Sequence, residues 1–174
     1  GLLQTLIIVW STDFNPIDMG LFIVLSFGAL WLAVLREKEF LWAGCFAFVA
    51  TLVGTSFNTE ESLLYYSIWP AGVALVFFGV SHFKALRSEQ AIYWRVLSLG
   101  SLIMTLLAVF VDREFLAGFH KPFDGFWMLM SVVVSSLILA AAEHLKRKVG
   151  SSESAVAKYS AMASFVVVFG LWDW

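Results

Sequence analysis

Long apolar stretches separated by short polar segments make up most of the chain. The stretch from Leu63 to Phe83 holds 21 residues without a formal charge, and a helix of about 20 residues crosses the hydrocarbon core of a bilayer. Glu60 and Glu61 precede this stretch, while His82 and Lys84 mark its other end. The pattern predicts one complete membrane crossing with an acidic and a basic border.

The same pattern recurs along the chain and predicts six spans in all. They are expected at about residues 19–35, 40–57, 63–83, 92–111, 125–142 and from 155 onward. Residues 1–10 are apolar but too short to cross, so they predict a short interfacial helix or, alternatively, the end of a further span. The expected fold is an all-α integral membrane protein, a bundle of six transmembrane helices with an N-terminal interfacial helix, in a single polytopic domain over residues 1–174.

Composition agrees with a membrane protein. Apolar residues make up 60% of the sequence and charged residues 14%, against about 45–50% and 25% in soluble domains, and the mean hydropathy is +0.85. The net charge is −2 and no basic stripe with interleaved aromatics occurs, which argues against binding to nucleic acid. Cys45 is the single cysteine, so an intrachain disulfide is excluded.

Basic residues alternate between the connections. The segments after the first, third and fifth predicted spans contain nine of the eleven: Arg36, Lys38, Lys84, Arg87, Arg95, Lys146, Arg147, Lys148 and Lys158. Connections rich in Lys and Arg stay in the cytoplasm. We therefore expect a bacterial inner-membrane protein with both termini extracytoplasmic.

Small residues recur at helical spacing in the second predicted span. Ala43, Ala47, Thr51 and Gly54 fall on one face, and such faces allow two membrane helices to approach closely. We expect this face to be a helix-packing surface.

The outer connection between residues 112 and 124 is a candidate contact surface. Phe115, Phe119 and Phe123 recur along it. The acidic pair Glu60 and Glu61 precedes the third predicted span on the same outer side. Phenylalanines at this spacing could anchor a partner while the carboxylates select a basic one. A connection that only lies on the lipid surface is the alternative.

Candidate chemistry is sparse. The central thirds of the predicted spans contain no Asp, Glu, Lys, Arg or His, although proton relays and counter-ions need such residues. Glu143, His144 and His82 share one border, but adjacent helical residues point about 100° apart, so Glu143 and His144 cannot bind one metal together. They are interpreted as border residues that meet water and headgroups, and we expect no catalytic residue, cofactor or metal.

Two short segments resemble known families. The segment Phe115 to Trp127, which ends in PFDGFW, resembles the connection before the fifth span of the urea and short-chain amide channels, and the expected six-span layout is similar too. The first two spans lack that family's Asn-Gly pattern. Asn15-Pro16 with Gly20-Leu21 resembles the NPxxxGL signature of acetate permeases, a family that implies termini inside. Because the two likenesses imply different proteins, no family is assigned.

The sequence favours a non-catalytic multi-pass membrane protein that acts as a subunit through helix-face association with itself or other membrane proteins. Its expected partners are the lipid bilayer and either a second copy of the chain or a membrane complex. The alternative is a channel or carrier for a small neutral solute, which needs no buried charge. A sensory membrane domain is the third interpretation, and the expected outward C-terminus argues against it.

Overall fold

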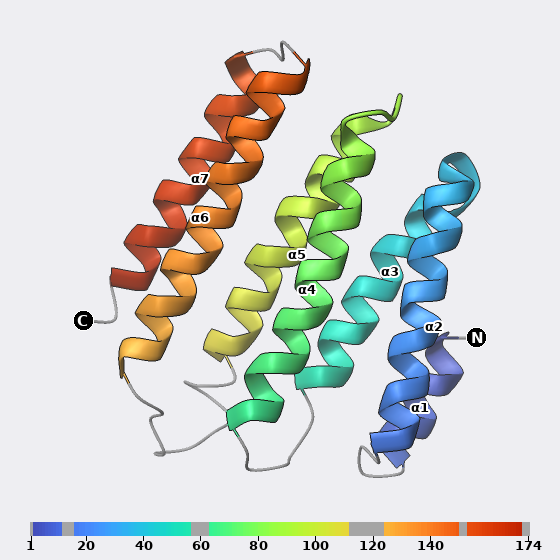
Figure 1. The fold of residues 1–174 in the computed structure, drawn as a ribbon. Coiled ribbons are helices and arrows are strands. Elements are labelled where there is room, and N and C mark those ends of the chain that lie inside the picture. Colours follow the sequence, from blue (N-terminus) through green and yellow to red (C-terminus); the bar gives the residue numbers. More distant parts are fainter. Residues whose placement is uncertain (1, 12–15, 57–62, 112–123, 150–152, 172–174) are drawn as a thin grey trace. The chain divides into compact units, whose positions relative to one another are not determined.

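The computed structural model describes residues 2–11, 16–56, 63–111, 124–149 and 153–171. These residues form helices and no strands (Figure 1). The helices are α1 (Leu2–Ser11), α2 (Pro16–Leu35), α3 (Glu37–Ser56), α4 (Leu63–Ala85), α5 (Ala91–Val111), α6 (Asp124–Val149) and α7 (Glu153–Leu171). The predicted all-α class is therefore confirmed.

Three helices are long and apolar enough to cross a membrane. Among the described residues these candidate spans are Ala91–Ala108, Met128–Arg147 and Ser154–Leu171. Two further apolar segments, Gly20–Leu35 and Ala71–Ala85, are shorter. The remaining predicted spans stay predictions, and so does the full count of six.

Two of the helix boundaries that differ from the sequence-based expectation involve charge. The segment around Arg36 was expected to be a charged turn, but α3 already begins at Glu37. Glu37 and Glu39 lie in its first turn, where carboxylates favour the positive end of the helix dipole. The helix expected to end at residue 142 continues to Val149, because strong helix formers extend it beyond the apolar stretch.

The chain divides into two compact units, Gly1–Ser81 and His82–Trp174. This division does not test the expected single domain over residues 1–174, which stays a prediction. In the first unit α2 packs along α3, and α1 contacts both. In the second unit α6 packs along α7 as an antiparallel hairpin, and α5 contacts α6 (Figure 1).

The first unit is held together by aromatic rings and small residues. The ring of Phe77 lies 5.2 Å from that of Phe48 and 6.2 Å from that of Phe27, measured between centroids. A Cβ atom on Gly44 of α3 would lie 3.1 Å from the Cβ atom of Ala33 on α2. This short distance shows that α2 and α3 approach closely, as small residues permit in membrane proteins.

The second unit has a core of large side chains on three helices. Its buried members are Trp94, Leu97 and Leu102 from α5, Ile138 and Leu145 from α6, and Tyr159 and Val166 from α7. The hairpin is closed by a hydrogen bond from the Ser135 hydroxyl to the Ala163 carbonyl at 3.0 Å. Gly170 permits the close packing of the two helices, because a Cβ atom at this position would overlap the side chain of Ser131.

Candidate functional site

The polar group that stands out in the second unit is a pair of histidines. His82 lies in the last turn of α4, and His144 lies near the end of α6. The Nε2 atom of His82 and the Nδ1 atom of His144 are 3.0 Å apart, within hydrogen-bonding distance. His82 is buried, with 5% of its surface exposed, so its earlier interpretation as a border residue that meets water is wrong.

This hydrogen bond limits the charge of the two imidazoles. One ring must supply an N–H group and the other a lone pair, so the facing nitrogens cannot both carry a proton. The pair therefore holds at most one positive charge while the bond persists. The Phe83 ring lies edge-on to both imidazoles, with centroids 5.9 Å from each, and covers one side of the pair.

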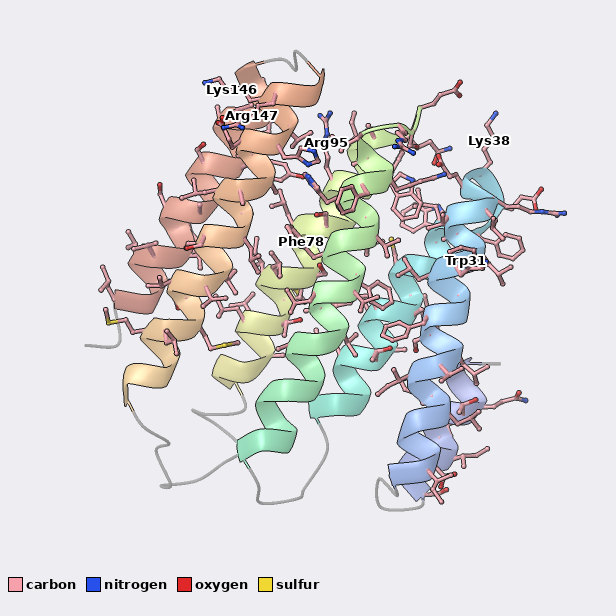
Figure 2. The ribbon with its side chains drawn as sticks, viewed as in Figure 1. Trp31, Lys38, Phe78, Arg95, Lys146 and Arg147 are labelled. Carbon is pink, nitrogen blue, oxygen red and sulfur yellow. The ribbon has the colours of Figure 1, made fainter. Side chains whose placement is uncertain are left out.

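Arg95 of α5 connects this pair to α7. Its charge interacts with His82 and with the buried Tyr159 of α7. Figure 2 shows Arg95 at the same end of the second unit as Lys146 and Arg147 of α6. The four helix ends thus bring two imidazoles, a guanidinium and a phenol into one region.

One donor in this region, the buried Nε atom of Arg95, has no acceptor among the described residues. The Tyr159 hydroxyl has Arg95 and Ser98 as polar neighbours and makes no hydrogen bond of good geometry with the residues that the structure describes. We refer to His82, Arg95, His144 and Tyr159 as the donor cluster.

Glu143 and Glu89, the carboxylates of the second unit whose side chains the structure describes, do not pair with this cluster. Glu143 is exposed, and its Oε1 atom accepts a hydrogen bond from Arg147 Nε at 2.9 Å. Glu89 is exposed as well. Within the described ranges no group of three or more His, Cys, Asp or Glu side chains is placed to hold a metal ion. The arrangement is therefore suited to holding negative charge.

The predicted packing face on α3 is described in part. Ala47 and Thr51 are fully buried and Ala43 is half-buried. The Thr51 hydroxyl lies 2.7 Å from both Ser26 Oγ on α2 and the Ala47 carbonyl, either of which can accept its one hydrogen. Thr51 therefore contacts α2 within the first unit.

The other predicted site residues cannot be compared with the structure. Gly54 and the proposed contact residues Glu60, Glu61, Phe115, Phe119 and Phe123 lie outside the residues whose surroundings are described. Their roles stay predictions.

Sequence reasoning missed the donor cluster because its members are far apart along the chain. His82, His144 and Arg95 were recognised only as residues of one border. The available signal was that the connections after α4 and after α6 belong to the same predicted border, which places the ends of α4, α5, α6 and α7 on one side. Which of those side chains meet depends on helix rotation, and an alternating charge pattern does not give that.

Comparison with known proteins adds no family. No protein-family model, curated protein or solved structure matches the chain, so its function is inferred from its own residues.

Proposed function

We propose that the chain is a non-catalytic multi-pass membrane protein that acts as a subunit, by association of helix faces with a second copy or with another membrane protein. The proposal includes six spans, a location in a bacterial inner membrane and extracytoplasmic termini. Three candidate spans support its membrane character. The other parts rest on the charge pattern of the sequence.

One observation on α7 carries the proposal. Ala157, Ala161 and Ser164 are exposed, and at 100° per residue they form a stripe opposite the buried face of Tyr159 and Val166. Small side chains bring no advantage toward lipid, whereas they permit close helix approach. Because only 28% of Ser154–Leu171 is buried within the chain, this stripe is available to a partner helix.

The hydrogen-bond acceptors of four buried hydroxyl groups favour a subunit over a solute channel. A path for a neutral solute needs polar groups that face it. Ser26, Ser101 and Thr105 instead donate to carbonyls of their own helices, and Ser135 donates to α7. These hydroxyls support packing.

The experiment measures the oligomeric state of the full chain in lipid nanodiscs by native mass spectrometry. Ala161→Leu on the stripe should lower the oligomer fraction at least about tenfold, because an added side chain prevents close approach. Ala140→Leu makes the same change at an exposed position of α6 and should leave assembly unchanged. A monomeric wild type that passes urea or glycerol into proteoliposomes would favour the channel instead.

The proposal also includes a second contact surface, on the outer connections. Phe115, Phe119 and Phe123, with Glu60 and Glu61, are the predicted contact residues on the outer connections. A cysteine at position 119, in a chain whose Cys45 is replaced, would capture protein if this surface binds a partner and only lipid if it does not.

A further inference from the structure

We propose that the donor cluster of the second unit binds a phosphate group, carried by an anionic phospholipid headgroup or free in solution. The ligand would lie among the ends of α4, α5, α6 and α7 and would accept hydrogen bonds from Arg95 and Tyr159. This binding site is independent of the assembly proposed above.

The first argument is the unpaired Nε–H group of Arg95. The Nε atom is buried, and no described residue accepts a hydrogen bond from it. A buried donor without an acceptor is costly, so such groups are found paired. Glu143 is bonded to Arg147 instead, and in the proposal a bound ligand supplies the acceptor for this N–H group.

The second argument is the chemical type of the groups that meet there. Arg95 and Tyr159 each have a hydrogen to donate, and Arg95 has no acceptor capacity at all. A cluster of donors around a guanidinium fits an anion with several oxygens. Guanidinium groups bind phosphate through paired N–H groups, which makes phosphate the best match.

The third argument is the additional positive charge around the cluster. The helix ends and connections at this border carry Lys84, Arg87 and Lys146. Basic groups between membrane helices on the cytoplasmic side attract anionic lipid headgroups.

The test uses the full chain, purified in neutral detergent and stripped of lipid. Its melting temperature is followed by tryptophan fluorescence during separate titrations with phosphatidylglycerol, phosphatidylcholine and inorganic phosphate. Phosphatidylglycerol or inorganic phosphate should raise the melting temperature of the wild type in a saturable way. Arg95→Gln should weaken this response at least about tenfold, because a charged hydrogen bond is lost.

Arg147→Gln is the matched control. It removes the same charge from the same border, but the Arg147 side chain is 76% exposed and bonded to Glu143. Its response should equal that of the wild type. Should Arg95→Gln fail to fold, Tyr159→Phe removes a single oxygen and should weaken the response about three- to tenfold.

The titrations also identify the source of the phosphate group. A response to phosphatidylglycerol alone assigns the site to a lipid headgroup, and an equal response to inorganic phosphate assigns it to a free anion. Equal responses of the wild type, Arg95→Gln and Tyr159→Phe would overturn the proposal. So would an equal loss in Arg147→Gln, since that shows only diffuse attraction to a basic surface.

Discussion

Gly170 sets how closely α7 can approach α6. A Cβ atom at this position would overlap the side chain of Ser131, and Gly170 itself is buried. In lipid, helix association depends on such close packing because the solvent is as apolar as the side chains. The identity of this one residue is therefore a condition for the hairpin.

Gly170→Ala should lower the free energy of unfolding by about 1–3 kcal/mol, the usual cost of an overpacked site. Thermal unfolding followed by circular dichroism in detergent measures it. Gly100→Ala is the control, because no atom lies within 4 Å of a Cβ atom there and alanine is the better helix former by up to about 1 kcal/mol. A Gly170→Ala variant as stable as Gly100→Ala would contradict the close contact.

At the scale of the element, α3 shows how small residues and hydroxyls act together. Ala47 and Thr51 are fully buried one helical turn apart, and the Thr51 hydroxyl reaches Ser26 of α2 at 2.7 Å. Ser26 donates to the Phe22 carbonyl in turn, so no hydroxyl in this contact is left without a partner. The contact is a short polar bridge within an otherwise apolar interface.

Ala47→Leu should destabilise the first unit by about 1–3 kcal/mol, because Ala47 is fully buried and a larger side chain there would overpack the contact. Val49→Leu enlarges a side chain of the same helix that is 50% exposed, and it should be neutral. Unfolding of both variants in a detergent mixture compares them directly. Equal stability of the two variants would show that the face of Ala47 is not a packing face.

Helix positions could be predicted from the sequence, but helix partners could not. The apolar stretches predicted the described helix boundaries to within about three residues, except at the end of α6, which its charged residues extend. The meeting of His82 with His144 escaped prediction because it depends on how α4 and α6 are rotated. A hydrophobic stretch of nearly uniform apolarity carries little information about rotation. The small residues of α3 did indicate a buried face, at Ala47 and Thr51.

At the scale of the whole molecule, charge is the feature that predicts orientation. Within the second unit, Arg95 lies at the same end as Lys146 and Arg147 (Figure 2), as an up-and-down path of α5, α6 and α7 requires. If that end is cytoplasmic, the C-terminus is extracytoplasmic.

A reporter enzyme fused after Trp174 tests this orientation. An alkaline phosphatase fusion should be active and a fluorescent protein that matures only in the cytoplasm should be dark. Lys146→Cys, in a chain with Cys45 replaced, should react with a thiol reagent only after the membrane is opened. A bright cytoplasmic fusion would reverse the orientation and favour the sensory interpretation.

The close fit of α6 against α7 has a consequence for biosynthesis. Lys158 lies within α7, and a lysine in a membrane segment makes insertion of that segment alone less favourable. Helix α7 fits closely against α6, because Ser135 of α6 donates a hydrogen bond to the Ala163 carbonyl and Ser131 of α6 lies against Gly170. The two segments can therefore enter the bilayer as one folded hairpin. The last helix of the described chain would then owe its insertion to the helix synthesised just before it.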